Sequence, residues 1–421
     1  MVVDTAPGWR TVYWVGLASG VSLSIATFLT YRPEAPLATR NVSAKEVLRD
    51  FDYLGFIGIT SGITLFLMGI VWEPQYGSTS PHFLAPLTIG ILVTIGTGFQ
   101  QVYWTKSPIL HPFLWRRFRT FTLQAIVVFV SGMLFYSLQA LYPQFMTSCF
   151  VGNDPIQVGI SQLPLGVSTV GGVISGLVLP WLSRRIGTNG VLAVGVFICA
   201  LFIALIAVVD YDQQGMAMGL ASAATFGIGK SAYEHTVLSW TNLLSIPLIQ
   251  LCAPDEWIGF ATGLRTLMSL GGGSVATSVF TTIFTGRAAE FVPEDVSAAA
   301  AAAGLPSSSI PALLSILTGA TPNISPTSVP GLTSEIMQVS QVALKKAYIR
   351  SFRYVWYSSI PFGVVALVAA AYTKDLTPVM TEKVAQVLKT VKPSDNEDVE
   401  KDIFGSNKPT SEESEQLEKY P

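Results

Sequence analysis

The most regular feature of the sequence is a succession of long apolar stretches separated by polar connections. A helix that crosses the hydrocarbon core of a bilayer needs about 20 mostly apolar residues. Nine segments meet this requirement, and they are approximately Thr11–Thr30, Tyr53–Trp72, Phe83–Tyr103, Phe121–Tyr142, Val158–Leu182, Gly190–Val209, Gly215–Leu251, Gly259–Thr285 and Val355–Tyr372. Because these runs are solid rather than alternating, they favour helices over barrel strands. The sequence therefore predicts an all-α polytopic membrane protein with about nine transmembrane helices.

The composition agrees with this prediction and excludes some partners. Half of the 421 residues are apolar and only 12% are charged, about half the charged share of an ordinary soluble protein. The net charge of −2 offers no excess of one sign, so we expect no nucleic-acid partner. The three cysteines are widely separated and lie in or beside apolar runs, which indicates neither a disulfide framework nor a zinc site.

The basic residues of the connections predict the orientation in the membrane. Lysines and arginines gather in the first, third and fifth connections, whereas the second, fourth and sixth contain acidic residues and neither lysine nor arginine. This alternation follows the positive-inside rule. It places the odd-numbered connections and the C-terminus in the cytosol.

The eighth connection, about Gly286–Tyr354, is then a long extracellular loop. It contains an alanine-rich run followed by several prolines, which suggests short helices joined by proline breaks. Asn323 begins a glycosylation sequon on this predicted outer side. After the last span, Thr377–Thr390 is expected to form an amphipathic cytosolic helix, followed by a disordered acidic tail from Pro393.

The seventh segment is unusual because its 37 residues far exceed one span. Ionisable residues such as Lys230, Glu234 and His235 occur in its middle, and such groups inside a membrane can form a proton relay. We favour a different explanation. Codons for Gly229–Ser231, Thr241–Asn242 and Leu244–Ser245 can contain intron splice signals, and removing Lys230–Ser245 leaves 21 residues, one ordinary span. Sequencing the messenger RNA distinguishes the two hypotheses.

The segment Gly259–Thr285 contains the consecutive glycines Gly271, Gly272 and Gly273. A phosphate-binding loop would require a preceding strand and a Gly-Lys-Ser/Thr ending, and the sequence instead continues with Ser274 and Val275. Small residues of this kind let two helices approach closely in lipid. We therefore predict that these three glycines form a helix-packing face.

Several phrases resemble the fungal trichothecene efflux pump branch of the major facilitator superfamily, a group of drug/proton antiporters with fourteen spans. The resembling phrases are Gly8-Trp9-Arg10, Asp52-Tyr53-Leu54-Gly55-Phe56, Tyr142-Pro143-Gln144, Ala253-Pro254-Asp255-Glu256 before Gly259–Arg265, Gly304-Leu305-Pro306 with Ser309–Leu314, and Ser359–Gly363. The resemblance covers about residues 8 to 390. It implies that the first span here corresponds to the sixth of fourteen, so that the chain is N-terminally truncated relative to the family.

The resemblance also implies a division of the chain. The expected parts are residues 1–31 as an orphan last helix of the N-terminal half, 32–105 as a cytosolic loop and two linker spans, 106–285 as the first five spans of a C-terminal six-helix half, 286–354 as the extracellular loop, 355–372 as the last span and 373–421 as the cytosolic end. Such transporters rock one half against the other around a site at the bilayer midplane. They use the proton gradient and no cofactor.

Within the C-terminal half, polar side chains at midplane depth are candidates for the substrate cavity. They are Gln124, Tyr136, Gln139, Tyr142 and Gln162. The spacing of Tyr136, Gln139 and Tyr142 predicts that they share a helical face. Aromatic rings with amides suit a large, weakly polar ligand, although Tyr142 could instead be an interfacial anchor.

Three arginines are candidates for gating or for setting the topology. Arg265 lies inside its span and could extend to the inner interface. It could instead pair with a carboxylate to hold the two halves closed inward, and this partner would lie in the absent half or be Asp255 or Glu256. Arg184 and Arg185 precede Gly187 in a loop that resembles a degraded copy of the superfamily's cytosolic gate loop, where Ser183 replaces the expected acidic residue. The sequence assembles no catalytic set and no metal site.

The sequence therefore predicts a transporter rather than an enzyme. The first hypothesis, which the resemblance implies, is efflux of toxins, drugs or secondary metabolites by proton antiport in the full-length form, across the plasma membrane or a vacuolar membrane. Siderophore-iron transport and a non-transporting membrane remnant remain as alternatives. The expected partners are a small-molecule substrate and the lipid bilayer.

Overall fold

The computed structural model describes residues 10–31, 44–105, 108–109, 115–152, 154–226, 245–246, 248–253, 258–319 and 329–377. Within these ranges the chain is helical and contains no β-strand. Seven of the described helices are long and apolar enough to cross a membrane. The prediction of an all-α polytopic membrane protein is confirmed.

The chain divides into two compact units, and the described part of the first is helix α1 (Arg10–Thr30). Four hydroxyl groups of α1 donate hydrogen bonds to backbone carbonyl oxygens four residues earlier, for example Ser24 to Gly20 and Thr27 to Leu23, each at 2.8 Å. These four hydroxyl groups are thereby satisfied within the helix itself, as a lipid environment requires. The second unit, Asn41–Thr381, contains all the elements described below.

Helix α2 (Ala44–Asp50) precedes a hairpin of α3 (Tyr53–Tyr76) and α4 (Pro81–Tyr103). Glycines bring these two helices together, since an added methyl group at Gly58 would overlap Thr97 and one at Gly90 would overlap the backbone of Phe66. At one end Asp52 caps α3 by accepting a 2.8 Å hydrogen bond from the Gly55 amide, and it also accepts from the Gln101 amide. Close packing therefore holds α3 and α4 together along their length, and the hydrogen bonds of Asp52 join them at this end.

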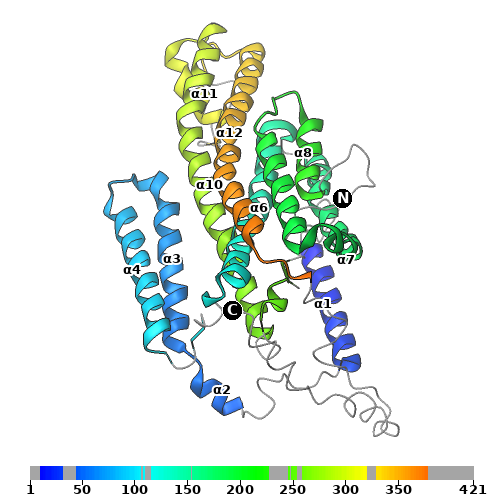
Figure 1. Cartoon of the computed structure of the whole chain (residues 1–421). Coiled ribbons are helices and arrows are strands. Elements are labelled where there is room, and N and C mark those ends of the chain that lie inside the picture. Colours follow the sequence, from blue (N-terminus) through cyan, green and yellow to red (C-terminus); the bar gives the residue numbers. More distant parts are fainter. Residues whose placement is uncertain are drawn as a thin grey trace, which may run out of the picture. The chain divides into compact units, whose positions relative to one another are not determined.

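The centre of the second unit is formed by α6 (Leu123–Met146), α10 (Ile258–Ala302) and α12 (Ser334–Tyr372), which pack against one another (Figure 1). Aromatic rings fill the space between them: Phe284 stacks on Phe352 at 4.2 Å between centroids, and Phe145 contacts both Phe352 and Trp356 edge-on. Helix α7 (Pro155–Ile206) packs on α12, α8 (Gln214–Phe226) packs on α7, and α3 packs on α10.

The fifth and sixth predicted spans lie in α7, which bends at Gly187, where φ is 75° and ψ is 159°. Of the seventh predicted segment, the beginning is described as α8 and the end as residues 245–246 and 248–251, and almost all of the suspected intron lies outside the described residues. The predicted sequon at Asn323, the amphipathic segment after Thr377 and the acidic tail also lie outside them. Cys149, Cys199 and Cys252 are all buried.

The region predicted as a loop of short helices is different in the structure. Helix α10 continues unbroken through the alanine-rich run to Ala302, and α12 already begins at Ser334, so both helices extend well beyond the predicted spans. Alanine is the strongest helix former, which explains why this run continues α10. Only α11 (Ile310–Leu317) is a short helix. We call residues 286–302, α11 and residues 334–354 the outer hairpin.

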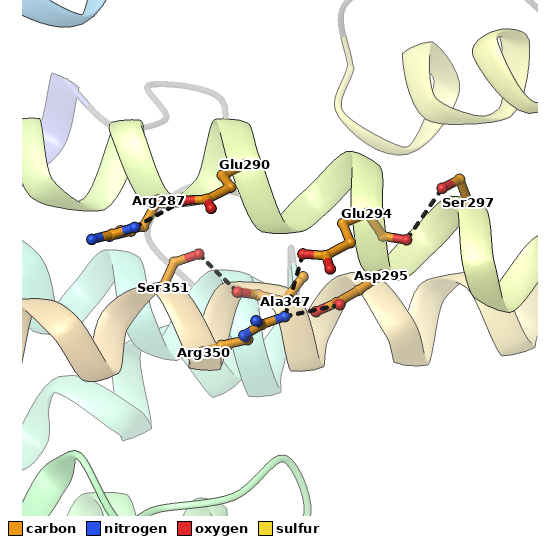
Figure 2. Close-up of polar contacts among 8 residues, drawn as sticks. All are labelled: Arg287, Glu290, Glu294, Asp295, Ser297, Ala347, Arg350 and Ser351. Atoms are coloured by element: carbon orange, nitrogen blue, oxygen red, sulfur yellow. Dashed lines mark hydrogen bonds and ion pairs between the residues drawn. The ribbon is translucent and has the colours of Figure 1, made fainter.

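The outer hairpin has its own stabilising contacts. A separate apolar cluster includes Phe291, Val296, Leu313 and Ile336. Figure 2 shows Arg350 of α12 reaching α10, where its guanidinium lies 3.1 Å from Asp295 and 3.6 Å from Glu294. The same guanidinium lies 3.9 Å from the centroid of the Phe291 ring. Charge pairs and a cation–π contact therefore join the two helices beyond the membrane-length segments.

Replacing Arg350 by alanine is expected to loosen the outer hairpin by about 1 kcal/mol, because partly exposed ion pairs and cation–π contacts each contribute fractions of this amount. Hydrogen exchange of the backbone around Phe291 measures the effect. Arg49→Ala is the matched control, since Arg49 pairs only with its exposed neighbour Asp50 among the contacts described for it. Equal exchange in both variants would contradict the prediction.

Candidate substrate groove

The candidate site lies along the contact between α6 and α10, which small residues bring close together. A methyl group on Gly272 would overlap the Phe129 carbonyl oxygen, and one on Gly132 would overlap the backbone of Ser269. A methyl group on Gly273 would lie 2.5 Å from the ring of Tyr136, whereas one on Gly271 would meet its nearest atom only at 4.0 Å. Gly272 and Gly273 thus lie against α6, and Gly271 lies beside this contact.

An open groove of about 420 Å³ runs beside this contact. It is lined by Tyr136 of α6 and by five residues of α10, namely Leu270, Gly273, Ser274, Thr277 and Ser278. The Ser274 hydroxyl donates to the Leu270 carbonyl oxygen at 3.0 Å, which leaves its oxygen lone pairs available as acceptors. The groove therefore combines one aromatic face, hydroxyl groups and a small apolar patch, with no charged group among its lining residues.

Of the five predicted cavity residues, only Tyr136 lines this groove. Gln139 is exposed on the same helix, whereas Tyr142 is fully buried within the apolar core. A helix turns by about 100° per residue, so two steps of three residues rotate a side chain by about 120° in total. This rotation explains why the three residues do not present one surface. Tyr142 is a core residue in the structure rather than an exposed interfacial anchor.

Gln124 and Gln162 lie away from the groove. Gln124 is fully buried, and neither polar atom of its amide has a hydrogen-bond partner among the described residues. Gln162 on α7 donates to the Ser161 hydroxyl at 3.3 Å, and its buried carbonyl oxygen has no partner within the described part of the chain. A buried amide without a partner is costly, so Gln124 is the most unusual polar group of α6.

Arg265 lies on α10, about one and a half turns before Leu270, the first groove residue of this helix. Its Nε donates a 3.0 Å hydrogen bond to the hydroxyl of Ser245, which is 1% exposed, and the guanidinium is within electrostatic range of Tyr136. The suggested partners Asp255 and Glu256 lie outside the described residues. The structure therefore gives Arg265 a neutral hydroxyl partner within this chain.

Arg184 and Arg185 are exposed at the turn before Gly187. The sequence lacks an acidic residue in this turn, but the structure brings one from the far end of the chain. Asp375, which follows α12, accepts hydrogen bonds from the Thr188 amide at 2.8 Å and from the Thr188 hydroxyl at 2.9 Å. No sequence signal links positions 187 residues apart, so sequence reasoning missed Asp375.

The hydroxyls of the groove were also missed, although a signal for them exists. Ser274, Thr277 and Ser278 have the i, i+3, i+4 spacing that places side chains on one helix face, and they follow the glycine-rich stretch directly. Within the described ranges, no three histidine, cysteine or acidic side chains come together as a metal site. The site can therefore contact a ligand by stacking and hydrogen bonding.

The sequence matches known transporters over nearly its whole length. It is 27% identical over 382 residues to the MFS-type transporter prx5 of Penicillium rubens, covering 89% of this chain and 66% of the relative. It is 24% identical over 407 residues to the trichothecene efflux pump TRI12 of Fusarium sporotrichioides, covering 95% and 65%. A tetracenomycin C resistance and export protein of Streptomyces glaucescens is 24% identical over 289 residues, covering 68% and 49%.

The chain thus spans just under two thirds of the length of the first two relatives. A model of the family described as "Fungal trichothecene efflux pump (TRI12)" matches residues 3–417. This match confirms the family predicted from the sequence phrases, which is a family of transporters rather than of enzymes. The chain belongs to the fungal trichothecene efflux pump (TRI12) family.

Proposed function

We propose that the full-length form of this protein exports toxins, drugs or secondary metabolites across a membrane in exchange for protons. The observation that carries the proposal is membership of an efflux pump family over residues 3–417. Because the chain spans just under two thirds of its first relatives, the proposal concerns the activity of the full-length form. The substrate is a small organic molecule, and the membrane is the plasma membrane or a vacuolar membrane, with the C-terminus in the cytosol.

The groove between α6 and α10 supports a weakly polar substrate. The Tyr136 ring offers a stacking surface, and Ser274, Thr277 and Ser278 offer hydroxyl groups. Sites for such ligands are mostly apolar with a few polar groups that fix the orientation. We propose that the groove is the part of the substrate path that this half contributes, with Arg265 toward the cytosolic end.

The packing of the second unit supports the transport mechanism of the superfamily. Residues 121–372 would form the C-terminal half that rocks as one body during alternating access. Helices α6, α7 and α8, together with residues 258–285 and 355–372, contain no aspartate, glutamate or histidine. The group that exchanges protons would therefore lie outside these segments.

A transport measurement tests the proposed function. The full-length form is reconstituted into lipid vesicles with an imposed pH gradient, and the accumulation of a labelled trichothecene is followed alongside a panel of polyketide and siderophore compounds. Accumulation of a toxin that disappears when a protonophore collapses the gradient supports proton antiport. Accumulation of an iron siderophore alone would overturn it in favour of uptake. Inserted, folded full-length protein that moves no compound would contradict the proposed export.

Replacing Tyr136 by alanine is expected to weaken substrate binding about tenfold, because an aromatic contact with its buried area is worth about 1.4 kcal/mol. Tyr136→Phe keeps the ring and should keep most of the affinity. The half-saturating substrate concentration in the vesicle assay measures the change. Tyr357→Ala, which removes a half-exposed tyrosine of α12, is the control. An unchanged half-saturation in Tyr136→Ala would exclude the groove as the binding site.

A further inference from the structure

A short segment after α12 joins three helices at one end of the second unit. This segment, Thr373–Thr377, is called the strap here. Leu376 of the strap is 4% exposed and belongs to the main apolar core. The Lys374 amide donates to the Arg119 carbonyl oxygen at 3.0 Å, just before α6. The strap is therefore anchored both to the core and to the start of α6.

Asp375 connects the strap to the bend of α7. One oxygen of its carboxylate, Oδ1, accepts from the Thr188 amide and hydroxyl and also from the Thr377 amide at 3.1 Å and hydroxyl at 2.7 Å. The Leu376 amide donates to the Thr188 hydroxyl oxygen at 2.8 Å. Thr188 thus gives and receives hydrogen bonds within a closed network with the strap.

The bend gives this network a mechanical role. Gly187 is the residue of α7 with non-helical backbone angles, so a new helical segment starts at Thr188 with unsatisfied amide groups. A carboxylate at a helix N-terminus satisfies these groups and is favoured by the helix dipole. A methyl group on Gly187 would lie 3.1 Å from Asp375 Oδ2 and 2.7 Å from Asn189 Oδ1. Asp375 therefore acts as a cap that comes from a distant part of the chain.

We infer that Asp375 is a positioning residue for transport, because the strap fixes the angle between the two parts of α7 and ties them to α12 and α6. This inference rests on the proposed function. Alternating access moves each half as a rigid body, and a half whose α7 can hinge freely at Gly187 transmits less of this motion. The outer hairpin braces α10 and α12 at one end, and the strap braces α7, α12 and α6 at the other.

The strap stays closed over the physiological pH range. Burial raises the pKa of Asp375, but the hydrogen bonds from Thr377 and Thr188 outweigh this effect and lower it from 3.8 to about 2. A depressed pKa adds stability above the ordinary value, and this stability is lost as the pH falls toward 2. The elements that meet here also carry the exposed cations Arg119, Arg184, Arg185 and Lys374. Asp375 is therefore ionised in the strap at physiological pH.

Hydrogen exchange of the full chain in lipid discs tests the strap without any transport assay. In Asp375→Ala the Thr188 amide should exchange about tenfold faster, because a hydrogen bond to a charged group contributes more than 1 kcal/mol. Asp375→Asn keeps an acceptor oxygen and should show a smaller increase. The control Asp212→Ala removes another exposed carboxylate and should leave Thr188 unchanged. If the Thr188 amide exchanges equally fast in Asp375→Ala and Asp212→Ala, the strap does not hold the bend of α7 as inferred.

The vesicle assay then tests positioning. Asp375→Ala should lower the maximal rate about tenfold while the half-saturating concentration stays constant, since the groove is untouched, and Asp375→Asn should restore most of the rate. A normal rate despite fast exchange at Thr188 would overturn the positioning role while leaving the proposed export intact. If neither the wild type nor any variant transports, the proposed function fails. The exchange result still decides whether Asp375 protects the Thr188 amide. Gel filtration and thermal unfolding exclude misfolded protein.

Discussion

Replacing Gly272 by alanine is expected to separate α6 from α10 and to destabilise the second unit by about 3 kcal/mol. The added methyl group would overlap the carbonyl oxygen of Phe129, and a backbone atom cannot rotate away as a side chain can. Overpacking of a well-packed interface commonly costs 1–3 kcal/mol, and a backbone collision lies at the upper end of this range. Thermal unfolding in detergent, followed by the exposure of the buried cysteines, measures the loss.

The neighbouring Gly271 provides a matched control. A methyl group there meets its nearest atom only at 4.0 Å, and alanine is a better helix former than glycine. Gly271→Ala should therefore be as stable as the wild type or slightly more stable. If both variants unfold at the same temperature, α6 and α10 do not approach as closely as the structure shows.

Replacing Gln124 by leucine is expected to stabilise the protein by about 1–3 kcal/mol, because this buried amide has no partner among the described residues and an unpaired buried polar group costs that much. Leucine has a similar size and no polar atoms. The same variant should transport more slowly if the amide receives its partner from the substrate or from another state of the cycle. Unfolding temperature and vesicle transport are measured together.

Gln144 of the same helix is exposed and serves as the control, since Gln144→Leu should change neither quantity. A destabilised Gln124→Leu would mean that the amide is already satisfied in the folded protein, for example by a bound water. Stabilisation with unchanged transport would mean that Gln124 has no part in the cycle. Only stabilisation together with slower transport supports its place among the predicted cavity residues.

The sequence predicts the helices well because span length and the requirement for internal hydrogen bonds leave few alternatives in lipid. The number of spans does not predict which helices pack together. Thr282 of α10 donates to the Ile70 carbonyl oxygen of α3, and an added methyl group on Gly363 of α12 would meet Ala200 of α7 at 2.5 Å. The family could be predicted because the resemblance rests on short sequence motifs, which can be recognised without knowledge of the fold.

The candidate site was less predictable, for two physical reasons. The rotation of a helix separates Tyr136 from Tyr142 even though their spacing looks periodic, so one residue lines the groove and the other is buried. The partner of a polar group can also lie far along the chain, as Asp375 does for Thr188. The extension of α10 to Ala302 shows a separate limit on predicting the fold, because hydropathy predicts where a helix leaves the membrane and not where the helix itself ends.

Because α10 extends to Ala302, a small tilt of this helix at the groove becomes a larger displacement at its end. From Gly273 beside Tyr136 to Ala302 at its end, the helix rises by about 44 Å, so a tilt of only about 5° at the groove would displace its tip by about 4 Å. A pair of spectroscopic probes on the outer hairpin and on the exposed connection 210–213 before α8 would therefore report small rearrangements around a bound molecule. The conformational cycle could then be followed from water, with every label kept out of the lipid-embedded core.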